Sequence, residues 1–148
     1  MIYKIEDVIS ISVIGVHIIP IILLVYTRNP IHIKAFIGSF AAIITEYIKY
    51  NIIGKNSSRP EGASNCNLMC NDGDMSGKPG MPSGHSVSAV FFSGFYFQNT
   101  NNNWIRIILV LYAVLIMYSR YYKKCHTINQ ISAGALLGLL LSWIVNKI

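Results

Sequence analysis

Two histidines and two arginines stand in three short motifs, and each motif lies at the end of a long apolar run. The first motif is Arg59-Pro60, the second is Pro82-Ser83-Gly84-His85, and the third is Ser119-Arg120 followed by His126. An arginine fork bonds two phosphate oxygens at once, and histidine serves as a nucleophile or as a general acid and base. This combination of residue types indicates phosphoryl transfer.

Two further features would support that chemistry. Ser83 and Gly84 precede an apolar segment that we expect to be helical, so unpaired amides at its N-terminus would face an anion, and Gly84 would let a phosphate approach the backbone. Gln130 stands four residues after His126 and would lie on the same helical face, where it could hold the imidazole. One histidine would then attack phosphorus, while the other would protonate the leaving oxygen and later deprotonate water.

The composition indicates that these residues are positioned by helices within a membrane. The chain has 148 residues, of which 53% are hydrophobic and only 12% charged, unlike an average soluble domain. Val8–Tyr26 carries no charge and approaches the roughly 20 residues that cross a bilayer. Further apolar runs cover Ile33–Ile53, Met81–Phe97, Trp104–Tyr118 and Ile128–Val145. We expect an all-α, multi-pass membrane bundle of about five transmembrane helices, the third and fourth of which are the least apolar.

One connection, residues 54–82, is much longer than the others. Of its 29 residues, 16 are Gly, Asn, Ser or Pro, and a loop of this length in a compact fold is usually functional or disordered. Because it joins two motifs, we expect an active-site loop. Five alternating spans would place all three motifs on one membrane face. We expect a single domain over residues 1–148, with its core at 35–145 and no nucleic-acid module; the sequence does not indicate an oligomeric state.

The three motifs resemble those of the type 2 phosphatidic acid phosphatase family, which shares its helical fold with vanadium-dependent haloperoxidases. The family pattern is K-x6-R-P, then P-S-G-H, then S-R-x5-H-x3-D, and the resemblance covers residues 49–130. It implies a lipid phosphate as substrate, a phosphohistidine intermediate and no metal or other cofactor. His126 would be the nucleophile and His85 the acid. The phosphate would be held by Lys49, Arg59, Ser83, Gly84 and Arg120.

The chain departs from the family pattern at two positions. Ile52 stands seven residues before Arg59, where the family has lysine, so we expect Lys49 to serve instead, with Lys55 as the second choice. Gln130 stands where the family has aspartate. A neutral amide can fix the imidazole tautomer but cannot stabilise an imidazolium by charge. We therefore expect slow turnover that Gln130→Asp would raise, and Glu46, Asp72 and Asp74 are the acidic residues that could substitute.

The sequence leaves three functions open. The first is an integral membrane phosphatase acting on phosphatidic acid, a related lipid monophosphate or a polyprenyl diphosphate. The second is an inactive relative that binds lipid phosphate or serves as a membrane scaffold. The third, vanadate-dependent oxidation, ranks lowest. Sidedness is open as well, since basic residues favour a cytoplasmic site whereas the resemblance implies a site that faces outward or into a lumen.

The remaining histidines and the cysteines suggest structural roles. We expect His17 to make an interhelical hydrogen bond and His32 to be solvated at a loop edge. Cys66 and Cys70 could pair if their membrane face is oxidising, since the further ligands of a zinc site are not found nearby. Cys125 adjoins His126, but the arginine spacing of a thiol phosphatase does not follow it.

Overall fold

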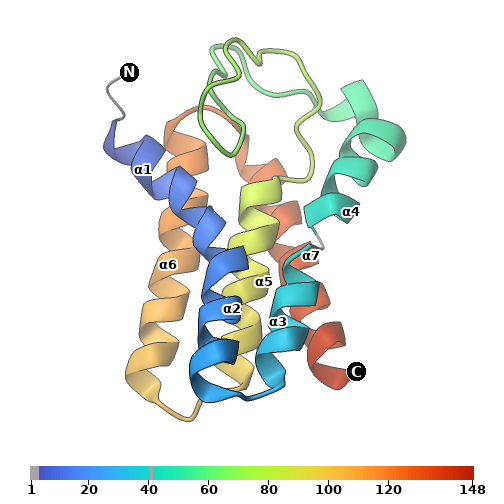
Figure 1. The fold of residues 1–148 in the computed structure, drawn as a ribbon. Helices are drawn as coiled ribbons and strands as arrows, with labels where there is room; N and C mark the ends of the chain where they lie inside the picture. The colour runs from blue at the N-terminus through green and yellow to red at the C-terminus, as the bar shows by residue number, and fades with distance from the viewer. Residues whose placement is uncertain (1–3, 41) are drawn as a thin grey trace.

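A computed structural model of the chain describes residues 4–40 and 42–148, and its regular elements are helices. They form an upright bundle with one long loop across one end (Figure 1). The α-helices are α1 (Ile5–Ile11), α2 (Gly15–Thr27), α3 (Ile31–Ser39), α4 (Ala42–Tyr47), α5 (Gly84–Gln98), α6 (Asn103–Tyr122) and α7 (Ile128–Lys147). A 3-10 turn at Ser12–Ile14 joins α1 to α2, and a π-helical turn at Ile48–Ile53 and a 3-10 turn at Gly54–Ser57 follow α4.

Four helical stretches are long and apolar enough to cross a membrane: Ile5–Thr27, Ile31–Ser57, α6 and α7. The expected all-α, multi-pass membrane bundle is therefore confirmed. The fifth expected span is shorter than the sequence suggests, because α5 has 15 residues and extends only about 22 Å. Ser83 caps this helix in an extended conformation, so α5 begins at Gly84 rather than at Met81.

Helix α5 lies at the centre of the bundle, where it packs most extensively against α7 and α6. Its buried side chains include Phe91 and Phe95, which form part of an apolar cluster. Two glycines of α7 permit close contact with α5, since a Cβ on Gly134 would lie 2.7 Å from the Ser83 carbonyl oxygen and a Cβ on Gly138 would lie 2.7 Å from that of Val87. This packing fixes the start of α5, where the second motif lies, relative to α7.

Residues 58–83, here called the cap loop, fold across the end of the bundle at which α5 and α7 begin (Figure 1). Its two arms are tied together by backbone hydrogen bonds, of 2.8 Å from Arg59 N to Lys78 O and 2.8 Å from Met75 N to Ala63 O. A small buried apolar cluster joins the loop to the turn before α7, and is made of Ala63, Cys66 and Met75 of the loop and Cys125 of the turn. The long polar stretch is therefore an ordered cover rather than a flexible linker.

The cysteines do not pair within the cap loop. Cys66 forms a disulfide with Cys125, in the turn between α6 and α7, with a Cα–Cα distance of 5.5 Å. The pairing of Cys66 with Cys70, which the sequence left open, does not form, because the loop folds back onto that turn and brings Cys66 to a distant partner. Cys70 is a buried free thiol whose sulfur lies 2.9 Å from Lys123 Nζ.

The two histidines outside the motifs both join helices. His17 of α2 makes the expected interhelical contact, with its Nδ1 atom 2.8 Å from the Ser39 hydroxyl oxygen of α3. The expectation of a solvated His32 is wrong. His32 is buried because α3 packs against α5, and its Nδ1 lies 2.9 Å from the Tyr96 hydroxyl.

Candidate active site

The three motifs converge beneath the cap loop around a cavity of about 470 Å³. Five of the residues expected from the sequence line it, namely Lys49, Arg59, Gly84, His85 and His126. The rest of the wall is largely apolar and includes Val13, Phe40, Ile43, Leu68 and Met75. The cavity thus combines cations and imidazoles with an apolar surface.

His126 is held between two partners on opposite sides of its ring. Its Nε2 atom lies 3.1 Å from Arg59 Nη1, and its Nδ1 atom lies 3.2 Å from Gln130 Oε1. The same Arg59 nitrogen donates to the Cys125 carbonyl oxygen at 3.0 Å. Since a guanidinium only donates, Nε2 carries the lone pair and Nδ1 carries the proton. The imidazole therefore presents an unprotonated nitrogen to an arginine that is suited to bind phosphate.

Gln130 has hydrogen-bond partners for both ends of its amide. Oε1 accepts from Thr127 N at 3.2 Å as well as from His126, while Nε2 donates to the carbonyl oxygens of Ser57 at 3.2 Å and Ser58 at 2.8 Å. The reversed amide would set a donor against two N–H groups and an oxygen against two carbonyls, so these partners fix its orientation. Gln130 consequently connects the nucleophile candidate to the residues that lead into Arg59.

The surroundings of His126 favour its neutral form. Burial, followed by the positive charges of Arg59, Arg120 and Lys49, lowers the pKa of His126 well below the usual histidine value, and the hydrogen bond to Gln130 opposes this only in part. The imidazole is therefore unprotonated at neutral pH, as a nitrogen nucleophile must be.

His85 lies in the first turn of α5 and lines the cavity, with a buried Nε2 that has no hydrogen-bond partner among the described residues. Gly84 precedes it on the cavity wall. Ser83 is fully buried and lies behind the wall, where its backbone N donates to Gln130 O at 3.1 Å and its hydroxyl accepts from Ser86 at 3.0 Å. The residues of the P-S-G-H motif therefore differ in their access to the cavity. Gly84 and His85 line it, whereas Ser83 lies behind them and supports them.

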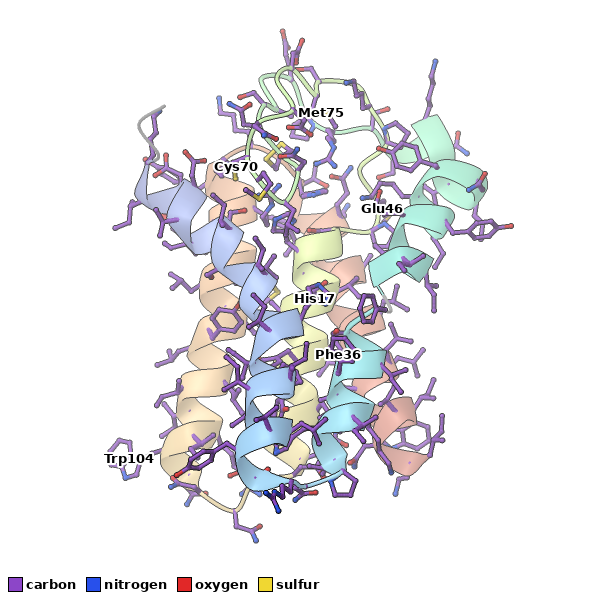
Figure 2. All side chains as sticks on the ribbon, in the orientation of Figure 1. His17, Phe36, Glu46, Cys70, Met75 and Trp104 are labelled. Carbon is purple, nitrogen blue, oxygen red and sulfur yellow. A yellow bond between two sulfur atoms is a disulfide. The ribbon has the colours of Figure 1, made fainter. Side chains whose placement is uncertain are left out.

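Lys49 reaches the cavity from the π-helical turn that follows α4. Its side chain is only 3% exposed and forms an ion pair with Glu46. Glu46, which is labelled in Figure 2, also lines the cavity. Lys55 is exposed and does not line the cavity. The π-helical and 3-10 turns take up the extra residues between this lysine and Arg59, and π-helical turns are frequent at functional sites.

Arg120 is fully buried and does not line the cavity. Its two terminal nitrogens donate to the Ser10 hydroxyl of α1 and to the Cys66 carbonyl oxygen, the latter at 2.5 Å. The structure therefore places Arg120 between the first span and the cap loop, while its charge still acts on His126.

Sequence reasoning missed several residues that support the site. Ser57 and Ser58 hold Gln130, and Ser10 holds Arg120. Their contacts are long-range, so a local pattern gives no signal for them. The pairing of Glu46 with Lys49 had a signal, namely the three-residue helical spacing.

The possible acidic substitutes for the family aspartate lie in different places. Glu46 and Asp72 line the same cavity as His126, whereas Asp74 is exposed and does not line it. Within residues 4–40 and 42–148, no group of three or more His, Cys, Asp or Glu side chains is placed to hold a metal ion.

A membrane-embedded helical bundle with three imidazoles and two cations around a largely apolar cavity defines a class of protein suited to act on an anionic lipid. Comparison with known proteins agrees with this. Residues 38–148 match the PAP2 superfamily, and the chain belongs to this family.

A curated relative is "Lipid phosphate phosphatase gamma" of Arabidopsis thaliana, which is 33% identical over 121 residues covering 71% of this chain and 49% of the relative. The chain therefore spans about half the length of that protein. No solved structure matches the chain. Both comparisons therefore place the chain in the PAP2 superfamily.

Proposed function

We propose that this protein hydrolyses the phosphomonoester or diphosphate of a lipid through a phosphohistidine at His126, without a metal ion. The observation that carries the proposal is the state of His126, whose unprotonated Nε2 meets Arg59 in a cavity that His85 and Lys49 also line. A phosphate bound by Arg59 would lie next to this lone pair. The positive charges of Arg59 and Lys49 can stabilise the negative charge that spreads over the phosphoryl oxygens in the transition state.

In the first step, His126 Nε2 attacks phosphorus. The P–N bond forms as the P–O bond to the lipid breaks, and His85 gives its proton to the leaving oxygen. A phosphate anion next to His85 favours the protonated form that this role needs. Gln130 keeps the proton of His126 on Nδ1 throughout. The lipid alcohol then leaves, or, when the substrate is a diphosphate, the lipid monophosphate.

In the second step, a water molecule attacks the phosphohistidine. His85, now neutral, takes a proton from the water as the P–O bond forms and the P–N bond breaks. Inorganic phosphate is released and both imidazoles return to their starting states. The apolar wall formed by residues such as Val13, Phe40 and Ile43 supports a lipid substrate, because it offers the hydrocarbon tail a surface next to the charged end of the cavity.

The experiment is phosphate release from mixed micelles that contain phosphatidic acid or a polyprenyl diphosphate, measured with EDTA present. We expect release by the wild type and a loss of about a thousandfold or more in His126→Ala, because the nucleophile is removed. His32→Phe is the matched control, since His32 is a buried histidine away from the cavity. A folded wild type that releases no more phosphate than His126→Ala would favour a lipid-binding or scaffold role.

A further inference from the structure

His17 is a polar residue in the apolar part of the active-site cavity. It belongs to the membrane-spanning stretch Ile5–Thr27 and lines the cavity together with Val13, Phe40 and Ile43. In Figure 2 it lies at a level between Glu46 and Phe36, deeper in the bundle than the cap loop. An ionisable side chain is costly within a membrane, and one that lines a cavity there usually has a function.

The hydrogen bonds around His17 fix its tautomer. The Ser39 hydroxyl has one proton, which it donates to the Phe36 carbonyl oxygen at 2.6 Å. Its oxygen must therefore accept from His17 Nδ1, at 2.8 Å. With the proton on Nδ1, the other ring nitrogen, Nε2, is an acceptor. The ring is further positioned by Phe40, whose centroid is 5.6 Å away.

Nε2 of His17 has no hydrogen-bond partner among the described residues, and the ring lies beside that of Phe40 in the cavity wall. An acceptor in such a place is best satisfied by a donor that the ligand brings. With its phosphate at Arg59 and His126, a lipid would have its backbone deeper in the cavity. The donor would then be a hydroxyl or N–H group between the phosphate and the hydrocarbon tail.

We propose that His17 is a specificity residue that accepts a hydrogen bond from the backbone of the substrate. The preferred substrates are then lipid monophosphates with a free hydroxyl or amino group near the phosphate, such as a monoacylglycerol phosphate or the phosphate of a long-chain amino alcohol. Diacylglycerol phosphates and polyprenyl phosphates lack this donor. The inference rests on the proposed lipid phosphatase function and selects among its substrates. His17 lies outside residues 38–148, the part that matches the family.

The test compares two lipids that differ by one hydroxyl group, 1-oleoylglycerol 3-phosphate and its 2-deoxy analogue, in identical micelles. We expect the wild type to prefer the hydroxyl lipid about tenfold in kcat/KM, which corresponds to one hydrogen bond. His17→Phe keeps a ring of similar size but lacks the acceptor, so it should hydrolyse both lipids at the rate of the deoxy analogue. His32→Phe should keep the preference, because His32 bonds to Tyr96 outside the cavity.

Ser39→Ala gives a second variant if His17→Phe does not fold. It leaves the ring in place but removes the group that fixes the tautomer, so the preference should fall. Equal kcat/KM of the wild type for the two lipids, or a preference that survives in His17→Phe and Ser39→Ala, would overturn the assignment of His17 and leave the phosphatase function intact. If the wild type hydrolyses none of these two lipids, diacylglycerol phosphate and a polyprenyl diphosphate, the proposed function is overturned and this inference with it.

Discussion

Gln130 gives His126 a neutral hydrogen-bond acceptor at the position where the family pattern has a carboxylate. Its oxygen accepts from His126 Nδ1, and its nitrogen is occupied by the carbonyl groups of Ser57 and Ser58. Aspartate is one methylene shorter and lacks the amide nitrogen, so the Gln130→Asp exchange suggested by the sequence would lose these contacts. Glutamate is the replacement of matched size.

We predict opposite effects of Gln130→Glu on turnover and stability. A carboxylate beside Nδ1 should stabilise the positive charge that His126 acquires as it attacks phosphorus, and should raise kcat about tenfold. It cannot donate to Ser57 and Ser58, so the free energy of unfolding should fall by about 1–3 kcal/mol. Phosphate release and thermal unfolding would measure the two effects. In Gln130→Met, which has neither group, activity should fall about 10- to 100-fold, and unchanged activity there would contradict the positioning role.

The lowered pKa of His126 predicts how stability depends on pH. In the unfolded chain a histidine takes up a proton as the pH falls through about 6.5, whereas buried His126 stays neutral to lower pH. The unfolded state then binds more protons, so the free energy of unfolding should decline below about pH 6.5 and be constant above it. Melting temperatures between pH 8 and pH 5 would show a smaller decline in His126→Gln than in the wild type; parallel curves would count against a depressed pKa.

At the scale of elements, the disulfide between Cys66 and Cys125 holds the cap loop against the turn before α7. Cys66 also supplies the carbonyl for Arg120, and Cys125 supplies one for Arg59 and precedes His126. The bond closes a loop with a sequence separation of 59. Losing such a cross-link typically costs 2–4 kcal/mol.

We therefore predict that Cys66→Ser lowers both the melting temperature and kcat, because the cap loop and Arg120 lose their anchor. Reduction with dithiothreitol should have the same effect on the wild type. Cys70→Ser is the control, since Cys70 is not in the disulfide. Activity of Cys66→Ser equal to that of Cys70→Ser would show that the cross-link does not position the site.

The sequence predicted the elements of the site well and their long-range contacts poorly. Arg59, His85 and His126 were expected on one membrane face because each lies at the end of an apolar run, and the structure places them around one cavity. The disulfide of Cys66 and the hydrogen bonds that Ser57 and Ser58 accept from the Gln130 amide depend on how the cap loop folds back. Hydrophobic periodicity carries no information about that fold.

The length of α5 and the position of Arg120 also depend on tertiary packing, which a local sequence pattern does not predict. The apolar run Met81–Phe97 is long enough to suggest a span, but its burial among other helices, rather than contact with lipid, accounts for its composition. Arg120 matches the family motif by sequence, yet its terminal nitrogens face Ser10 and Cys66. Only the packing of α1 and the cap loop determines that orientation.

At the scale of the whole molecule, the disulfide predicts the side of the membrane on which the site lies. Disulfides persist in oxidising compartments, so the cap loop should face the cell exterior or an organelle lumen. This side agrees with the family resemblance, which implies a site that faces outward or into a lumen. It disagrees with the cytoplasmic site that the number of basic residues favours, but several of those residues have roles in the site. The loop between α5 and α6 would lie on the opposite, reducing side.

Labelling with a membrane-impermeant maleimide in sealed vesicles of known orientation would measure this. Glu61→Cys introduces a thiol at an exposed position of the cap loop, and Asn101→Cys does so in the loop between α5 and α6. We expect Glu61→Cys to react only when the extracytoplasmic face is outside, and Asn101→Cys only in the inverted vesicles. The reverse pattern would place the site in the cytoplasm.

The most direct test of the whole account is a search for phosphate on His126 during turnover. Enzyme mixed with a lipid that carries a radiolabelled phosphate, and quenched within milliseconds in alkali, should retain label that is stable to base and released by acid, as expected of phosphohistidine. His126→Ala should retain none. Steady phosphate release by the wild type with no labelled protein, or equal labelling of His126→Ala, would contradict the phosphohistidine mechanism.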